Sequence, residues 1–395
     1  MSERHPRPAR VVVVGASAAG LTVAEALRRE GFAGELVMVG DETEPPYDRP
    51  PLSKQVLKGD WPLRKTHLRN EETLQALEAE WVLGAPADSV DLGRRVVTVG
   101  DREIPYDALV IATGVRPRTL PSARQVGVHT LRTLEDATRL RRDLRTTARL
   151  AVIGSGFLGI EAAAVARQMD LDVTVIDVLT APLVRQLGPE IAAHVLDLHL
   201  GHGVEFRLGT SVPAIETGSD GRSHIHLDQG DPVVADAVLV GIGSLPNTEW
   251  LADSGLTIEN GVVCDQHNQA HPHVWAAGDV ARWYHPGIGR HLRIEHRMNA
   301  TEQGMNVAKA IMGNPVPFAP VPYFWTDQYD VKIQAYGHLG GDCEVEVVAG
   351  SYTGGRFAAV YRVEGEIVGA LSWNMPREVR ALRRQLVERM KAATG

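Results

Sequence analysis

The sequence predicts an α/β fold in which one strand, turn and helix unit occurs twice. In the first unit the apolar strand 11–14 precedes a glycine-rich turn at residues 15–20 and an amphipathic helix. In the second unit the strand 150–153 precedes the turn 154–159 and another helix. The first glycine of such a turn permits the bend, the second lets backbone approach a pyrophosphate, and the third lets helix pack on strand. The repeat therefore predicts two bound dinucleotides.

Each unit needs an acidic residue after its second strand, where a carboxylate can accept hydrogen bonds from ribose hydroxyls. The later unit supplies Asp177 directly after the strand 171–176. The earlier unit is a looser match, since Asp41 follows an extra glycine and Ser17 replaces the middle glycine of the turn. From these residues alone, the alternative of two α/β layers whose glycines serve only packing stays open.

Length, charge and hydropathy narrow the class of protein. A chain of 395 residues that is 44% hydrophobic is long enough for two or three domains with their own cores. The net charge of -8 argues against nucleic-acid binding, which needs an excess of lysine and arginine. No apolar run approaches the roughly 20 residues that span a bilayer, and residues 1–10 precede no signal core. We therefore expect a cytoplasmic protein that binds neither nucleic acid nor membrane.

The cysteines exclude one route for electrons. Cys264 and Cys343 are the only two, and they form no Cys-x-x-Cys pair. The sequence therefore predicts neither a metal site nor a redox-active dithiol. We expect both side chains to be buried or half-buried small hydrophobes.

The order of the predicted elements indicates nested domains. The second unit interrupts the first. A further strand follows at 237–240, and the chain afterwards returns, through a strand at 274–277, to complete the first domain. From about residue 320, alternating apolar stretches are typical of an antiparallel sheet. A terminal helix then carries four apolar residues on one face: Val379, Leu382, Leu386 and Met390. The predicted fold is two Rossmann-like dinucleotide-binding domains, one inserted in the other, plus a C-terminal α+β domain.

Four short motifs carry a resemblance to a known family. They are residues 47–54 (Tyr-Asp-Arg-Pro-Pro-Leu-Ser-Lys), 112–114 (Ala-Thr-Gly), 276–279 (Ala-Ala-Gly-Asp) and 324–328 (Phe-Trp-Thr-Asp-Gln). In this order they resemble the FAD-containing, NADH-dependent ferredoxin reductases of the putidaredoxin reductase type, in the pyridine nucleotide-disulfide oxidoreductase superfamily. The resemblance implies an FAD domain at 8–115 and 240–319, an NAD domain at 116–239 and a C-terminal reductase domain at 320–395.

The resemblance also implies which residues bind FAD. The pyrophosphate would lie on Gly15, Ser17, Ala19 and Gly20, with Arg49 as a fixed cation for phosphate. The other implied FAD contacts are Asp41 on the adenosine, Ala87 at the adenine, Thr113 and Gly114 at a strand end, Arg132 at the FAD edge, and Asp279 on the ribityl chain.

The implied nucleotide site lies on the second turn. Its candidates are Gly154, Gly156, Gly159, Asp177, Arg185 and Gly243. A second negative group against Asp177 costs energy, so we expect NADH to be preferred over NADPH. Arg185 would weaken this preference if it folded back onto the ribose.

Lys54, Glu161 and Trp325 are the candidate catalytic residues. By the resemblance, Lys54 and Glu161 pair where flavin and nicotinamide meet, and an ammonium there favours the reduced flavin. Trp325 would shield the flavin ring. From the residues alone, the alternatives are that Glu161 is an ordinary first-turn helix acid and that Trp325 only packs in a core. Arg297 departs from the family, which has an apolar or aromatic residue there; it either adds positive charge near the flavin or points outward.

The resemblance implies an enzyme that passes hydride from NADH to FAD, then single electrons to a 2Fe-2S ferredoxin serving a cytochrome P450 or ring-hydroxylating dioxygenase. An NADH oxidase or quinone-type reductase, and a redox-signalling flavoprotein like apoptosis-inducing factor, are the alternatives, and the oligomer, monomer or homodimer, stays open. The terminal segment offers a basic docking face or simply a solvated helix face. Its basic residues are Arg377, Arg380, Arg383, Arg384, Arg389 and Lys391. Another basic stretch, Arg64 and Lys65, follows the Lys54 loop and is a candidate to share this docking surface.

Overall fold

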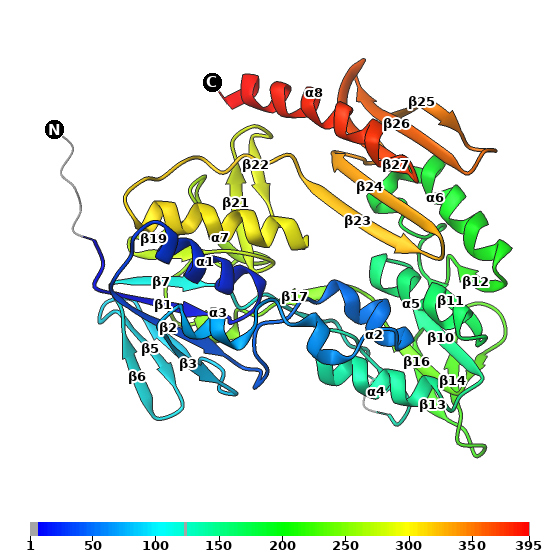
Figure 1. The fold of residues 1–395 in the computed structure, drawn as a ribbon. Coiled ribbons are helices and arrows are strands. Elements are labelled where there is room, and N and C mark those ends of the chain that lie inside the picture. The colour runs from blue at the N-terminus through cyan, green and yellow to red at the C-terminus, as the bar shows by residue number, and fades with distance from the viewer. Residues whose placement is uncertain (1–6, 122–124, 395) are drawn as a thin grey trace.

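A computed structural model describes residues 7–121 and 125–394, with the side chains of 391–394 left out (Figure 1). Residues 1–6, on which part of the expectation about the start of the chain rests, lie outside the described residues. The described chain forms two mainly parallel α/β layers and a C-terminal antiparallel sheet with its own helix. The predicted fold class is confirmed.

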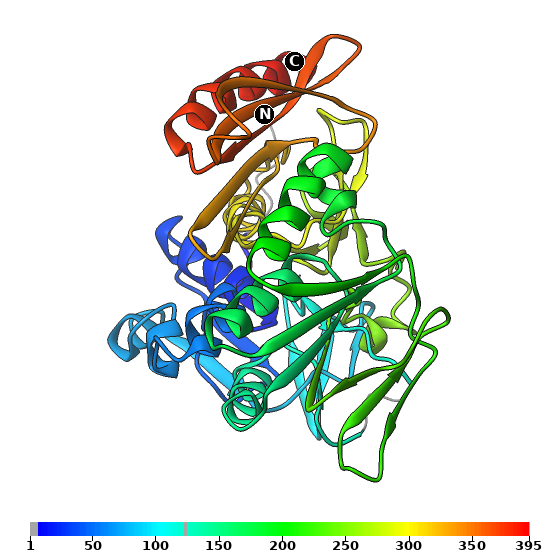
Figure 2. The same cartoon turned by 90° about the vertical axis from the view of Figure 1, so that its right-hand side faces the viewer.

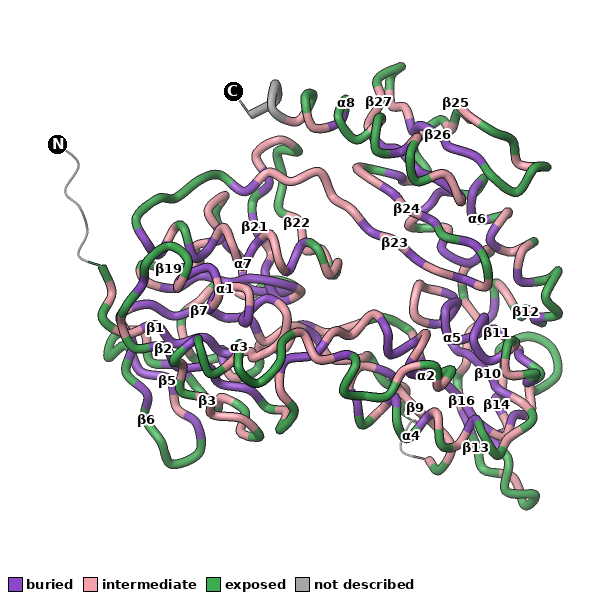
Figure 3. The backbone as a smooth tube through the Cα atoms, viewed as in Figure 1, coloured by how far each residue is buried: buried purple, intermediate pink, exposed green. Residues whose placement is uncertain are grey.

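The first layer is a six-stranded sheet in the order β19-β20-β7-β1-β2-β3. Its strands are β1 (Arg10–Val14), β2 (Glu35–Gly40), β3 (Ala79–Leu83), β7 (Ala108–Ile111), β19 (Gln269–His271) and β20 (Val274–Ala276). Helices α1 (Ala18–Arg29) and α7 (Arg297–Ile311) pack against each other and on one face. The other face is covered by two small sheets, β4 (Ser89–Asp91), β5 (Val96–Val99) and β6 (Arg102–Pro105), and β18 (Val262–Cys264), β21 (Ala281–His285) and β22 (Arg290–Leu292). Both faces are buried (Figure 3), which explains why the central strands are apolar throughout.

The second layer is a five-stranded parallel sheet in the order β12-β11-β10-β16-β9. Its strands are β9 (Val128–His129), β10 (Arg149–Ile153), β11 (Asp172–Asp177), β12 (Val204–Leu208) and β16 (Ala237–Val240). One face packs on α4 (Leu134–Leu144), α5 (Phe157–Gln168) and α6 (Val184–Gly201). The other packs on the antiparallel sheet of β13 (Ala214–Thr217), β14 (Ser223–His226) and β15 (Val233–Ala235).

Two short strands join the layers where the chain leaves the first layer and returns to it. β8 (Val115–Pro117) and β17 (Ser244–Pro246) pair antiparallel. Beside them Thr113 Oγ1 donates to the carbonyl oxygen of Asn247 at 2.8 Å, and Asn247 Nδ2 donates to the carbonyl oxygen of Thr113 at 2.9 Å. The remaining short elements are α2 (Gln55–Lys58), α3 (Glu71–Gln75) and the 3₁₀ turns Pro50–Ser53, Leu63–Thr66 and Glu249–Leu251.

The C-terminal sheet has the order β23-β24-β27-β26-β25 and carries α8 (Pro376–Thr394) on one face (Figure 2). Its strands are β23 (Tyr323–Gln328), β24 (Val331–Gly337), β25 (Glu344–Ser351), β26 (Arg356–Val363) and β27 (Glu366–Trp373). Alternating side chains in the sequence predict strands at 331–334, 344–348, 357–362 and 366–371, whereas β23 coincides with the motif 324–328. The opposite face shares one core with α5 and α6. Tyr361 Oη, for example, donates to the carbonyl oxygen of Leu187 on α6 at 2.8 Å.

Candidate cofactor site

Two adjoining cavities run from the first glycine turn to the C-terminal sheet. Their volumes are about 720 and 260 Å³. They form one continuous space, because Ser17, Tyr47, Arg49 and Ala112 line both. The larger cavity contains the predicted residues Gly15, Asp41, Ala87 and Thr113. The smaller contains Ala19, Lys54, Gly114, Arg132, Glu161, Asp279, Arg297 and Trp325.

In the first glycine turn, backbone segments approach one another too closely for a side chain to fit between them. Gly15 has a φ of +118°, and a Cβ there would lie 2.1 Å from the carbonyl oxygen of Ala112. A Cβ on Gly20 would lie 1.9 Å from the carbonyl oxygen of Gly15, so this glycine seats α1 on β1 and lines neither cavity. Ser17 caps α1 without a side-chain hydrogen bond to the helix, which leaves its hydroxyl and the helix N-terminus facing the cavity. A helix N-terminus in this position suits a phosphate.

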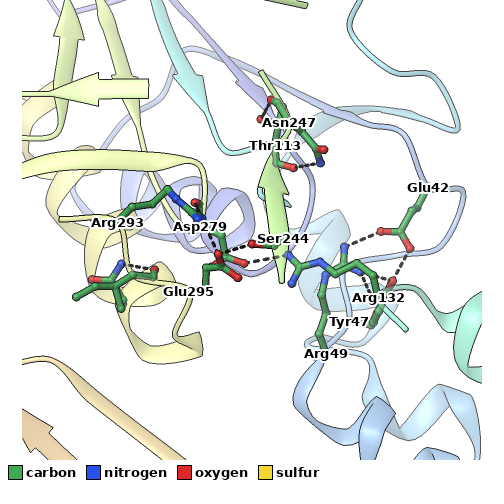
Figure 4. Close-up of polar contacts among 12 residues, drawn as sticks. Glu42, Tyr47, Arg49, Thr113, Arg132, Ser244, Asn247, Asp279, Arg293 and Glu295 are labelled. Atoms are coloured by element: carbon green, nitrogen blue, oxygen red, sulfur yellow. Dashed lines mark hydrogen bonds and ion pairs between the residues drawn. The ribbon is translucent and has the colours of Figure 1, made fainter. Parts of the chain in front are cut away.

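Arg49, which the resemblance implies is a fixed cation for phosphate, is held by three hydrogen bonds. Its guanidinium donates to Glu42 Oε1 at 2.6 Å, to Tyr47 Oη at 2.8 Å and to the carbonyl oxygen of Arg132 at 2.7 Å (Figure 4). Tyr47 Oη also donates to Glu42. The Glu42 carboxylate therefore matches the charge of Arg49 at the wall of the larger cavity. Glu42 is not among the candidate site residues named from the sequence.

Arg132 and Asp279 meet although they are far apart in the chain. Arg132 Nη2 lies 3.0 Å from Asp279 Oδ2. Arg293 donates to the carbonyl oxygen of Asp279 at 3.1 Å and to Glu295 Oε1 at 2.7 Å, and Ser244 donates to Glu295 (Figure 4). Residues from the segment before α4, from β17 and from the segment between β20 and α7 thus hold this end of the smaller cavity together.

Lys54 and Glu161 form a buried ion pair in the smaller cavity. Lys54 Nζ lies 2.8 Å from Glu161 Oε2, and the two side chains are 11% and 8% exposed. Ser53 Oγ donates to the same carboxylate oxygen at 2.6 Å, and Thr326 Oγ1 donates to Oε1 at 2.8 Å. Because α5 begins at Phe157, Glu161 lies beyond its first turn. The alternative of a first-turn helix acid is therefore wrong.

Arg297 lies at the cavity wall, where its charge is matched. Its Nε lies 2.5 Å from Asp48 Oδ1, and its Nη1 donates to Thr301. Trp325 is half-buried in the same wall, and its ring stacks on Tyr323 with centroids 5.9 Å apart. Its exposure to the cavity disfavours a purely core-packing role.

His296 is a cavity residue that sequence reasoning missed. It is the N-cap of α7, and burial lowers the pKa of its imidazole to about 4. Its Nδ1 is buried and has no hydrogen-bond partner in the described structure. The one sequence signal that could have identified His296 is its position directly before Arg297, which was already a candidate site residue. An unpaired buried polar atom beside a helix N-terminus fits a bound ligand such as the flavin.

The second glycine turn is more open. A Cβ on Gly156 would meet nothing within 4 Å, whereas one on Gly159 would lie 2.0 Å from the carbonyl oxygen of Gly154. Asp177 Oδ2 accepts from the backbone nitrogen of Ser155 at 2.6 Å and from its Oγ at 2.7 Å. The predicted residues Arg185 and Gly243 are exposed. Of this turn and its helix, Phe157, Leu158 and Glu161 reach the smaller cavity.

The two cysteines have the environments that the sequence predicted. Cys264 is buried and Cys343 is half-buried, as expected. One group with donor atoms within 4.8 Å of one another, His338, Asp342 and Cys343, has the types of ligand that hold metals, and it lies in the β24–β25 loop. Among the described helices, none combines the length and apolarity needed to cross a bilayer.

The fold and the cavity define a protein with two dinucleotide-binding layers and a third domain that closes the space between them. The family described as pyridine nucleotide-disulphide oxidoreductase matches residues 9–304, and the reductase C-terminal family matches residues 323–394. The chain belongs to the pyridine nucleotide-disulphide oxidoreductase family, which implies FAD and NADH as cofactors.

Three relatives indicate the branch of the family. The chain is 36% identical to rhodocoxin reductase of Rhodococcus erythropolis, over 96% of this chain and 90% of that one. It is 38% identical to the ferredoxin–NAD(+) reductase component of the p-cumate 2,3-dioxygenase system of Pseudomonas putida, over 96% and 94%. Its fold is similar to the crystal structure of the covalent putidaredoxin reductase–putidaredoxin complex, with a TM-score of 0.91, 35% identity, and coverage of 96% and 93%.

Proposed function

We propose that this protein is an NADH-dependent ferredoxin reductase. It would take hydride from NADH onto FAD and pass single electrons to a 2Fe-2S ferredoxin that serves a cytochrome P450 or a ring-hydroxylating dioxygenase. One observation carries the proposal. The cavity that starts at the first glycine turn ends at the Lys54–Glu161 pair, and Glu161 lies on α5, the helix that follows the second glycine turn. Two dinucleotides on the two turns would therefore meet at one point.

The chain would supply positions and charges, while bound FAD supplies the redox chemistry. The N-terminus of α1 at Ser17 would hold the pyrophosphate, and Asp279 and Arg132 would hold the middle of the cofactor. Trp325 and His296 would border the flavin ring, and Phe157 would lie on the side from which the nicotinamide arrives.

Lys54 would act through its charge. An ammonium that is only 11% exposed lies in a region of low dielectric, where a fixed charge acts more strongly than in water. Glu161 fixes the ammonium at one place, and Ser53 and Thr326 fix Glu161. This arrangement would stabilise negative charge that arrives on the flavin.

The division of the chain into an FAD domain (8–115 and 240–319), an NAD domain (116–239) and a C-terminal domain (320–395) is part of the proposal. The membership of the sheets supports it, because β19 and β20 complete the sheet of β1 while β9 to β12 and β16 form their own. A cytoplasmic location, where NADH is available, is also part of the proposal.

The ferredoxin would dock on α8. Arg377, Arg380, Arg383, Arg384 and Arg389 are exposed there, and Glu378 and Glu388 are the acidic residues of the helix. Lys391, which the sequence added to this set, has a side chain outside the described residues. Arg389 pairs with Glu366 at 3.0 Å, which leaves less of its charge for a partner. An acidic ferredoxin would be steered to such a face.

Aromatic rings connect α8 to the cavity. Arg383 lies over the ring of Tyr336, 5.8 Å from its centroid, and Tyr336 stacks on Tyr323 at 4.5 Å. Tyr323 in turn stacks on Trp325 in the cavity wall. A partner on α8 would therefore lie over the side of the C-terminal sheet that borders the proposed flavin site.

The function is tested by measuring where the electrons go. Purified protein with FAD should reduce an added 2Fe-2S ferredoxin rapidly when NADH is supplied. Peroxide formation at a rate comparable to NADH consumption, with slow ferredoxin reduction, would instead indicate an NADH oxidase. NADH-induced dimerisation without rapid transfer to any acceptor would indicate a redox-signalling protein.

The docking face is tested by charge reversal. Replacing Arg380 and Arg384 by glutamate should raise the ferredoxin KM about tenfold at low salt and flatten its dependence on ionic strength. NADH reduction of ferricyanide should be unchanged. A second variant reverses Arg64 and Lys65, which are also exposed but lie in the 3₁₀ turn Leu63–Thr66, and a raised ferredoxin KM there would show that this stretch shares the docking surface. An unchanged ferredoxin KM in the α8 variant would place the partner elsewhere.

A further inference from the structure

A chain of buried polar groups extends from Glu161 away from the cavity. Thr326 Oγ1 donates to Glu161 Oε1 at 2.8 Å, and Gln328 Nε2 donates to Thr326 Oγ1 at 3.3 Å. Gln328 Oε1 lies 2.9 Å from His199 Nε2, and His199 Nδ1 lies 3.2 Å from Tyr329 Oη. Thr326, Gln328 and His199 are at most 1% exposed. Buried polar groups are costly unless they are paired, so this chain needs an explanation.

In this series of hydrogen bonds each group donates to the next group on the way to Glu161. A carboxylate paired with Lys54 only accepts, so the Thr326 hydroxyl proton is committed to it. The Thr326 oxygen then accepts from the Gln328 amide, whose oxygen faces His199. His199 must therefore carry its proton on Nε2, with Nδ1 free to accept from Tyr329. Hydrogen bonds aligned in one direction polarise one another, which strengthens the last bond of the chain.

The fold creates this chain by bringing three segments together. Along β23 the alternation of strand side chains places Phe324, Thr326 and Gln328 on the buried face, against α5. His199 comes from the last turn of α6, and Tyr329 follows β23 with a φ of 56°. The ring of His202 stacks on Tyr329 at 3.6 Å and covers the outer end of the chain.

We propose that Thr326, Gln328 and His199 are positioning residues that hold the charge and orientation of Glu161, and through it the Lys54 ammonium at the flavin. This rests on the proposed function, in which Lys54 favours electron arrival on the flavin. Without the hydrogen bond from Thr326, the negative charge of Glu161 is less stabilised, so Glu161 interacts more strongly with Lys54 and neutralises more of the positive charge of the ammonium. The flavin would then be harder to reduce.

Thr326→Val tests the proposal, because valine keeps the shape and removes the hydroxyl. The variant should keep FAD, show a lower flavin midpoint potential, and be reduced by NADH about tenfold more slowly, since hydrogen bonds to charged groups are the stronger ones. Thr326→Ser should restore the potential and the rate. Gln328→Leu and His199→Phe should lower the potential by successively smaller amounts.

His285→Phe is the matched control. His285 is fully buried and its Nε2 lies 2.9 Å from the carbonyl oxygen of Pro320, so the variant also loses a buried imidazole and its hydrogen bond. It should lower the melting temperature without changing the flavin potential. An equal shift of potential in His285→Phe and His199→Phe would overturn the proposal, because general destabilisation would then explain both.

Two further results would overturn it. One is a Thr326→Val protein that is fully loaded with FAD and has unchanged potential and reduction rate. The other is a ¹⁵N-histidine NMR spectrum of the oxidised holoprotein that shows His199 protonated on Nδ1. If Thr326→Val does not fold, the potentials of Thr326→Ser and Gln328→Leu decide. None of these measurements needs a ferredoxin, so failure to reduce ferredoxin would reject ferredoxin as the acceptor, whereas the flavin potentials test the role of Thr326 separately.

Discussion

The two glycine-rich turns have the same sequence pattern but different surroundings. The turn at Gly15 opens into a continuous cavity that three sections of the chain enclose. The turn at Gly154 faces an open region, where Arg185 and Gly243 are exposed and Gly156 has free space around it. A cofactor that stays bound needs an enclosed site, whereas a nucleotide that must enter and leave in each turnover needs an open one. The difference therefore fits FAD on the first turn and NADH on the second.

The acidic residues that follow the second strand of each unit also differ between the two sites. Asp177 accepts two hydrogen bonds from Ser155 and so belongs to its own turn before any nucleotide arrives. In the first layer it is Glu42, rather than Asp41, that is held in place, by Arg49 and Tyr47. In the second layer the glycine turn itself thus holds Asp177, the candidate ribose acceptor, whereas in the first layer the held carboxylate is fixed within the loop after β2.

The largest expected effect comes from adding one methyl group to each turn. Gly15→Ala should abolish FAD binding, because its φ of +118° and the 2.1 Å approach to Ala112 leave no room for a Cβ. Gly156→Ala should fold and keep FAD, since its Cβ meets nothing within 4 Å, but it should raise the KM for NADH. The ratio of flavin absorbance at 450 nm to protein absorbance measures the first effect. Full FAD occupancy in Gly15→Ala would refute the assignment of the turns.

The next effect concerns the point where the two sites meet. Lys54→Met should keep FAD but slow its reduction by NADH about 100-fold, as removal of one preorganised charge or donor typically does. Lys54→Arg, which keeps the positive charge, should be affected much less. Stopped-flow absorbance at 450 nm follows the reduction. Wild-type rates in a fully loaded Lys54→Met protein would show that Lys54 only anchors its loop.

Lys54→Met also leaves Glu161 as an unpaired buried carboxylate, which is itself destabilising. The double variant with Lys54→Met and Glu161→Gln removes that cost. It should recover the melting temperature but not the rate of flavin reduction. Recovery of both would mean that the slow rate came from disturbed structure.

The smallest effect concerns nucleotide choice. NADH should be preferred over NADPH by at least about tenfold in kcat/KM, because a 2'-phosphate would lie against Asp177. Asp177→Asn should lower kcat/KM for NADH and narrow the preference. Ser155→Ala removes one donor to Asp177 but keeps its charge, so the preference should remain. Equal kcat/KM values for the two nucleotides in the wild type would contradict the assignment of Asp177.

The sequence by itself determined the two dinucleotide-binding units, their nesting and the antiparallel C-terminal sheet. It could do so because strand and helix periodicity, glycine turns and strand-end acids are local features that neighbouring residues specify. Lys54, Glu161 and Trp325 were indicated by the resemblance to the family that the ordered motifs carry, although Glu161 itself lies outside those motifs. These residues line one cavity in the structure.

Only the tertiary structure decided which distant charges meet. Arg297 is matched by Asp48 across 249 residues and Arg132 by Asp279 across 147 residues, separations that no local pattern encodes. Likewise Glu161 receives donors from the loop before α2 and from β23, which reach it because the C-terminal sheet packs on α5. The sequence specifies which side chains are charged, but the partner of each charge depends on which distant segments pack into the same core.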